Sequence, residues 1–174
     1  MHKFRLSWVI AWLLLFSGSS TKPPDQLKWR SLPETAIAYH NKKKPILIDL
    51  YTNWCGWCKV MDKKTYTDKN VVSYLNENFY VAKVNAETKK ALSWQGKIYQ
   101  FNSAYKSNDF AVFVTKGNLS YPTTVIFPVD GSEAQAIPGY LTPKEMEMLL
   151  KYFGEGKYGK MSFQEYSKGF VARW

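Results

Sequence analysis

The residues with the clearest chemical potential are Cys55 and Cys58, the two cysteines of the chain. They are separated by Gly56 and Trp57 and lie where an apolar strand is predicted to lead into a helix. The free N–H groups and the dipole at a helix start stabilise negative charge, and thiols in such motifs have pKa values of about 3.5–7.5. Because the thiolate attacks in disulfide exchange, we expect Cys55 to be exposed and nucleophilic, and Cys58 to face inward and resolve the mixed disulfide.

Three other roles are open to the cysteine pair. A zinc site usually needs four ligands, and beyond the two cysteines the chain offers only His2 and His40 as soft or borderline ligands. Covalent haem attachment needs a histidine after the second cysteine, where Lys59 stands. An inert structural disulfide is possible, although closing so short a loop stabilises little. The residues therefore favour a redox pair without a metal or another cofactor.

The elements expected to position the pair alternate between strand and helix. Ile46–Tyr51 is apolar on both faces, as a covered central strand would be, but Asp49 interrupts it. Ser31 with Glu34, and Thr142 with Glu145, are capping boxes that predict helix starts. The other predicted helices cover residues 55–64, 68–79 and 162–170, and the other strands cover 80–84, 123–127 and a third ending near 137, after a turn at Asp130-Gly131.

The segment Ile48–Lys59, in which Trp54 directly precedes the cysteine motif, resembles the active-site segment of thioredoxins. Three later stretches match that family in order, namely its third strand, its cis-proline turn and the glycine before its last helix, at Ala82–Glu87, Tyr121–Thr123 and Gly139. The resemblance covers about residues 30–153 and is closest to exported domains such as the C-terminal domain of the DsbD electron shuttle. It implies an α/β thioredoxin fold, with a central mixed sheet flanked by helices on both faces.

The resemblance also implies roles for residues around the motif. Asp49, six residues before Cys55, matches a buried acid that assists proton transfer at the second cysteine, and burial should raise its pKa. The alternative is that Asp49 has no catalytic role and is a hydrogen-bonded carboxylate at the end of a strand. Lys83 matches the lysine beside that acid, and Lys59 the lysine that typically follows the motif.

The same resemblance predicts a substrate-binding face. Pro122 would be cis, and the Tyr121 backbone would hydrogen-bond an extended substrate segment, as in strand addition. Trp54, Gly56 and Trp57 would contribute to this face, although either tryptophan could be a packing aromatic.

Two departures from the family concern redox direction and partner choice. The inner pair Gly56-Trp57 replaces the Gly-Pro of reducing thioredoxins, and potentials in the superfamily span about −270 to −120 mV. An insertion at about 88–120 leads into the Pro122 loop, so it either shapes partner choice or is structural padding. We expect a hairpin over 92–101 that turns at Gln95-Gly96, whereas 108–117 could be a helix or β-rich.

The N-terminus predicts export. Residues 1–20 have a basic start, an apolar run at Leu6–Phe16 and small residues up to Ser20, as in a signal peptide cleaved near Ser19-Ser20. The run is short for a membrane span of about 20 residues, but an uncleaved anchor is the alternative. The expected organisation is a spacer at 21–29, one thioredoxin-like domain at 30–154 and a C-terminal extension at 155–174, in the periplasm or another extracytoplasmic compartment.

The net charge is +10, or +8 if Lys3 and Arg5 are removed with the leader. Such a charge favours acidic partners or anionic membrane surfaces, and the chain has no nucleic-acid-binding motif. The leading hypothesis is a reductase-type thiol–disulfide oxidoreductase that acts on thiols and disulfides of exported proteins and is fed by a membrane electron donor of the DsbD type. The alternative is a non-catalytic binding module with an inert disulfide, suggested by the insertion and the 17% aromatic content.

Overall fold

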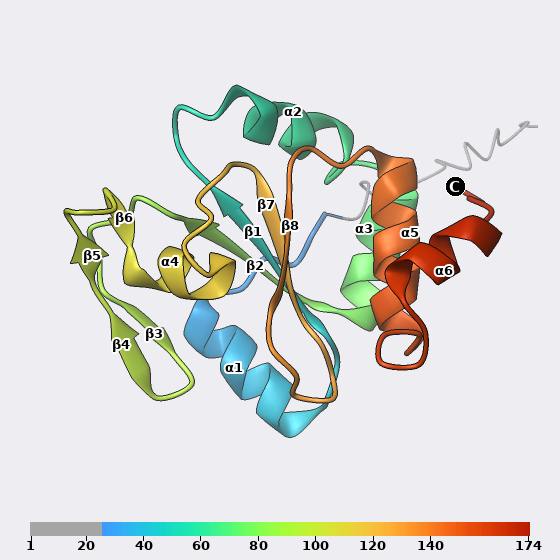
Figure 1. The fold of residues 1–174 in the computed structure, drawn as a ribbon, viewed down its shortest axis with the longest axis horizontal. Helices are drawn as coiled ribbons and strands as arrows, with labels where there is room; N and C mark the ends of the chain where they lie inside the picture. Colours follow the sequence, from blue (N-terminus) through green and yellow to red (C-terminus); the bar gives the residue numbers. More distant parts are fainter. Residues whose placement is uncertain (1–25) are drawn as a thin grey trace, which may run out of the picture.

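A four-stranded mixed sheet lies at the centre of the fold (Figure 1). The computed structural model describes residues 26–174. The strand order is β2-β1-β7-β8, where β1 is parallel to β2 and β7 is antiparallel to both of its neighbours. These strands are β1 Ile46–Tyr51, β2 Tyr80–Asn85, β7 Thr123–Phe127 and β8 Gln135–Pro138. The predicted mixed sheet and the hairpin through Asp130-Gly131 are thus confirmed.

Helices cover both faces of this sheet, as predicted (Figure 1). One apolar core lies between the sheet and the helices α2, α3 and α5, and a second lies between the sheet, α1 and α4. The helices are α1 Leu32–Asn41, α2 Gly56–Lys64, α3 Lys69–Asn78, α4 Asp109–Thr115, α5 Pro143–Gly154 and α6 Phe163–Gly169. Both predicted capping boxes form, at Ser31 before α1 and at Thr142 before α5.

The alternation of side chains along β1 determines where its acid points. Ile46, Ile48 and Leu50 belong to the core under α1 and α4, whereas Leu47 belongs to the core under α2, α3 and α5. Successive strand residues point to opposite faces, so Asp49 shares the face of Leu47. Its carboxylate is therefore directed into the layer that contains the cysteine-bearing helix.

The insertion at 88–120 folds into two small hairpins and a helix. Its strands are β3 Leu92–Trp94, β4 Lys97–Tyr99, β5 Phe101–Asn102 and β6 Ser107–Asn108. Gln95 and Gly96 turn the first hairpin with φ values of 48° and 79°, as a type I′ turn requires. The ambiguous segment 108–117 contains α4, which the Asn108 side chain caps and which buries Phe110.

Residues 26–29, which the sequence placed at the end of an N-terminal spacer, contact the domain. Leu27 belongs to the core, the Lys28 backbone N–H donates to Asn76 Oδ1 at 3.0 Å, and the Trp29 ring lies 5.2 Å from that of Tyr66. Apolar and aromatic side chains at 27 and 29 supply this docking. The predicted signal peptide and the spacer residues 21–25 lie outside the described residues.

The C-terminal extension also docks on the domain. Glu147 of α5 is fully buried and accepts the backbone N–H groups of Arg173 and Trp174. The Trp174 ring then lies 5.9 Å from Tyr74 on α3. In the part of the chain from residue 26 onward, no helix has the length and apolarity needed to cross a membrane.

Candidate active site

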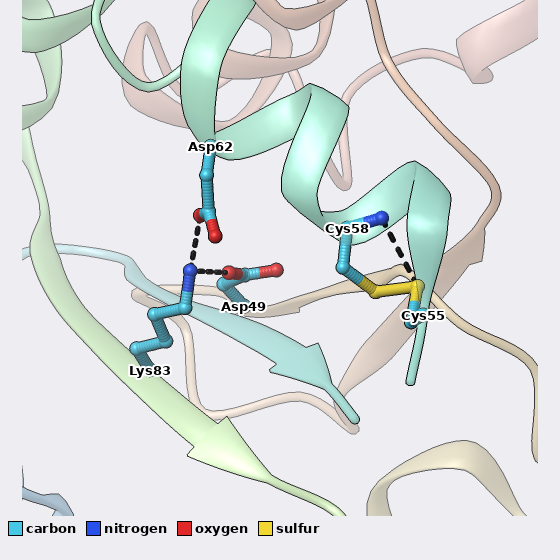
Figure 2. Close-up of polar contacts among 5 residues, drawn as sticks. All are labelled: Asp49, Cys55, Cys58, Asp62 and Lys83. Atoms are coloured by element: carbon cyan, nitrogen blue, oxygen red, sulfur yellow. Dashed lines mark hydrogen bonds and ion pairs between the residues drawn. A yellow bond between two sulfur atoms is a disulfide. The ribbon is translucent and has the colours of Figure 1, made fainter. Parts of the chain in front are cut away.

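The two cysteines form a disulfide at the start of α2 (Figure 2). Their Cα atoms are 5.3 Å apart, within the normal range for a disulfide. Cys55 is the N-cap of α2, and its sulfur accepts the Cys58 backbone N–H at 3.0 Å. The Cys55 N–H itself donates to the Thr52 carbonyl at 3.3 Å. An orphan N–H of the first helical turn is therefore aimed at the sulfur that was predicted to carry charge.

Both cysteines are only 3% exposed, so the expectation of an exposed Cys55 is wrong for this disulfide form. In this form the Cys55 sulfur is bonded to Cys58 and faces an N–H group of the helix N-terminus. The exposed groups of the motif are instead the neighbouring tryptophans, since Trp54 is 67% and Trp57 is 63% exposed.

Asp49 is buried beneath the motif and paired with Lys83. The two residues face each other in the parallel β1–β2 register, and Lys83 Nζ lies 3.1 Å from Asp49 Oδ2. Burial raises the pKa of Asp49 to about 6, although the Lys83 charge works to lower it. In Figure 2 one carboxylate oxygen is directed at Lys83 and the other is turned toward the side of Cys58. Asp49 therefore combines a buried position with a pKa near neutrality, which suits proton exchange.

A second carboxylate, Asp62 on α2, also pairs with Lys83 (Figure 2). Partial burial works to lower the pKa of Lys83, but the charges and hydrogen bonds of the two carboxylates outweigh it and raise that pKa. Asp62 borders a cavity of about 470 Å³ that Lys83 and Tyr66 also line. The network thus connects the buried Asp49 to the surface. Asp62 was not predicted from the sequence, although its position four residues after Cys58, on the same helix face, was an available signal.

We expect Asp62→Asn to lower the pKa of Asp49. The negative charge of Asp62 raises the pKa of Asp49. Without that charge, Lys83 pairs with Asp49 only, which lowers the pKa of Asp49 further. Titration of the Asp49 carboxyl carbon by NMR would measure the shift. Glu165→Gln, an equal charge change on the exposed surface of α6, is the control and should leave the titration in place. An unchanged Asp49 titration in Asp62→Asn would contradict the coupling.

The two tryptophans lead into an aromatic surface. The Trp57 ring stacks on Tyr140 at 5.5 Å, and the Trp54 ring meets the edge of Tyr121 at 6.0 Å. The Trp54 indole N–H donates to Glu87 Oε1 at 2.9 Å, which ties the loop before α2 to the end of β2. Tyr140 and Glu87 were not predicted, because partners this distant in sequence are set only by the fold.

The predicted cis-proline turn borders the same surface. The Tyr121–Pro122 bond is cis. Tyr121 and Pro122 line a cavity of about 290 Å³ together with Trp57, Gly139 and Tyr140. Gly56 is exposed in the first turn of α2. Lys59 is also exposed, and among residues 26–174 it makes no ion pair, so the structure does not bring it into the Asp49 network.

Comparison with known proteins gives a family match over most of the chain. Residues 32–154 match the family model described as a thioredoxin-like domain. The curated thiol:disulfide interchange protein DsbD of Campylobacter jejuni is 22% identical over 103 residues, which are 59% of this chain but only 15% of that protein.

Solved structures give the same fold. A thioredoxin-fold protein from Helicobacter pylori is 20% identical, with a TM-score of 0.56 over 72% of this chain and 83% of the other. An oxidoreductase named DsbH is 14% identical, with a TM-score of 0.54 over 78% and 90% of the two chains. At these identities the structural likeness concerns the fold.

Proposed function

The chain belongs to the thioredoxin-like domain family, and from that premise we propose that it is a thiol–disulfide oxidoreductase whose redox group is the Cys55–Cys58 pair. The observation that carries the proposal is a disulfide at the N-terminus of α2, with an N–H already directed at the Cys55 sulfur. A thiolate formed there on reduction would keep that hydrogen bond and gain from the helix dipole. The buried Asp49 behind the motif supplies a group that can exchange a proton near neutral pH.

The proposed reaction is the reduction of a substrate disulfide in two steps. The Cys55 thiolate attacks one substrate sulfur, forms a mixed disulfide and releases the other substrate sulfur as a thiolate, which takes up a proton. Cys58 then gives its proton to Asp49 and attacks the Cys55 sulfur. The bond between Cys55 and the substrate breaks, and the substrate sulfur that was held in the mixed disulfide leaves as a thiolate. Two electrons pass from the dithiol to the substrate, and the protein ends in the disulfide form described above.

Substrate binding would use the aromatic surface beside the motif. An extended substrate segment would pair with the Tyr121 backbone next to Pro122 and place an apolar side chain in the cavity between Trp57 and Tyr140. The predicted leader at residues 1–20 supports substrates among exported proteins in the periplasm or another extracytoplasmic compartment. The names of the relatives DsbD and DsbH support protein thiols and disulfides as partners, and a membrane donor of the DsbD type would return the pair to the dithiol.

Reduction of insulin disulfides tests the proposal. The protein, kept reduced by dithiothreitol, should accelerate insulin precipitation well above the dithiothreitol background. Equilibration of Cys55–Cys58 with glutathione should give a potential nearer −270 mV than −120 mV, the reducing end of the family range. Absence of any acceleration contradicts the oxidoreductase assignment, whereas a potential near −120 mV contradicts only its reducing direction.

The burial of both cysteines favours one alternative, a non-catalytic binding module with an inert disulfide. The reduced protein distinguishes the two functions. Fast alkylation of Cys55 near pH 6 would show a stabilised thiolate and support the oxidoreductase. Slow alkylation that appears only at high pH would support the binding module.

A further inference from the structure

The insertion at 88–120 carries an excess of positive charge. It contains five lysines and one acid, Asp109, and so contributes +4 to a chain of net charge +10. Lys116 pairs with Glu133. In residues 26–174 the other four lysines make no ion pair, and all are exposed, namely Lys89, Lys90, Lys97 and Lys106.

These lysines are mounted on a well-anchored scaffold. Asn108 is fully buried, and its backbone N–H donates to the Ala86 carbonyl at 2.6 Å. Its side-chain amide donates to the carbonyls of Thr88 and Lys90, at 3.4 and 3.2 Å. Trp94, Tyr99 and Phe110 pack beneath the two hairpins in the core. The lysine backbones are therefore held in place relative to the sheet.

Three of the four lysines lie within three residues of Glu87 or Ser107, whose side chains contact Trp54 and Tyr121. Lys106 precedes Ser107, whose hydroxyl lies 3.2 Å from the hydroxyl of Tyr121, the residue before Pro122. Lys89 and Lys90 follow Glu87, which accepts the indole N–H of Trp54. The insertion is thus tied to Tyr121 through Ser107, and it begins directly after Glu87, which holds the Trp54 indole.

Lys97 lies at the other end of the sheet. It follows the turn at Gln95-Gly96, and Gln95 lines a cavity with Phe127 and Pro128, at the end of β7 remote from Pro122. Figure 1 shows the β3–β4 turn pointing away from α2. Lys97 therefore carries the same charge as the other three lysines and belongs to the same insertion, but it lies far from the disulfide.

Among residues 26–174 the two acids nearest in the chain, Glu87 and Asp109, form no ion pair with the three lysines and so offset their charge only in part. The carboxylate of Glu87 accepts the Trp54 indole, and that of Asp109 accepts the Asn102 side-chain amide at 2.9 Å. We propose that Lys89, Lys90 and Lys106 form a basic rim that selects partner proteins with acidic residues beside their reactive disulfide. This inference rests on the proposed function and names the partner class of that site.

A protein partner fits this surface better than an anionic membrane. The rim adjoins Trp54 and Tyr121, which a partner disulfide must approach to reach Cys55. A bilayer lying on the rim would obstruct that approach, whereas an acidic segment would bring the disulfide to it. Complementary charge raises association rates by about 10–10³-fold, and salt screens the effect over about 10 Å at 0.1 M.

The basic rim can be tested with two cystine peptides. They differ only in the residues that flank the disulfide, which are three glutamates in one peptide and three glutamines in the other. The reduced full-length protein should react with the acidic peptide about tenfold faster at low salt, and the ratio should approach one at about 0.5 M salt. In the variant Lys89→Glu/Lys90→Glu/Lys106→Glu the acidic peptide should lose its advantage. The single variant Lys97→Glu is the control and should keep most of it, since its charge is remote from the disulfide.

The peptide experiment distinguishes failure of the basic rim from failure of the proposed function. Reduction of both peptides at equal, salt-independent rates overturns the basic rim and leaves the proposed function intact. Reduction of neither peptide overturns the proposed function itself. If the triple variant keeps the peptide preference but no longer sediments with phosphatidylglycerol vesicles that bind the parent protein, the rim serves a membrane and this inference is wrong.

Discussion

Cys58→Ser is expected to stop turnover and to hold Cys55 in mixed disulfides with partner proteins. The second step of the proposed reaction needs a sulfur at position 58, because a serine hydroxyl cannot displace the substrate from the Cys55 sulfur. Steady-state insulin reduction should fall by about 10³-fold or more, as for the loss of other catalytic nucleophiles. The trapped adducts should appear as dithiothreitol-sensitive bands on non-reducing gels, and mass spectrometry should assign them to Cys55.

Cys55→Ser and the double serine variant are the matched controls. All three variants lack the internal disulfide, so they share any effect of its loss on stability. Only Cys58→Ser should form adducts, since it alone keeps the attacking sulfur at the helix N-terminus. Trapping by Cys55→Ser and not by Cys58→Ser would reverse the roles of the two cysteines, and trapping by neither single variant would remove the basis of the proposed reaction.

Local patterns in the sequence were sufficient to predict the frame of the site. The capping boxes at Ser31 and Thr142 and the apolar strand broken by Asp49 are signals contained within a few residues, and the structure confirms each. The cysteine pair was predicted from its spacing at a strand-to-helix junction, and the structure places it there. The cis Pro122 and the buried position of Asp49 depended on the family resemblance, and the structure shows both.

The features that sequence reasoning missed depend on contacts between distant elements. Asp62 reaches Lys83 only because α2 packs over β2, and Tyr140 reaches Trp57 only because the turn after β8 passes beside α2. The burial of Cys55 in the disulfide form was likewise not predicted. The Ser107–Tyr121 contact, on which the proposed basic rim depends, was equally invisible, because it forms only when the insertion folds back on the Tyr121 loop.

Asp49→Asn is expected to make the protein more stable at pH 8 and slower as a reductase. Burial raises the pKa of Asp49 from 3.8 to about 6, so the folded protein binds this proton more tightly than the unfolded chain does. The parent protein should therefore gain stability through this group as the pH falls from about 7 to 3, by about 3 kcal/mol in total. Above pH 7 the ionised carboxylate destabilises the fold by that amount, and an asparagine lacks this cost.

Urea unfolding of both proteins at pH 8 and pH 3 would measure the effect. The variant should be more stable by up to about 3 kcal/mol at pH 8, and the difference should shrink toward zero near pH 3, where Asp49 is mostly protonated in both the folded and the unfolded state. Lys83 keeps Asp62 as a partner in the variant, so no cation is left unpaired. Glu165→Gln is the control for an acid on the exposed surface and should change neither profile.

The same variant should resolve mixed disulfides about 10²-fold more slowly near pH 7, because Cys58 loses its proton acceptor. The stability and the exchange rate of Asp49→Asn together distinguish the two roles that the sequence left open for Asp49, proton transfer and a purely structural role. A carboxylate kept for structure should lower stability when it is replaced and leave the exchange rate unchanged. A buried acid that destabilises the fold at neutral pH, and whose loss slows the reaction, is retained for its chemistry.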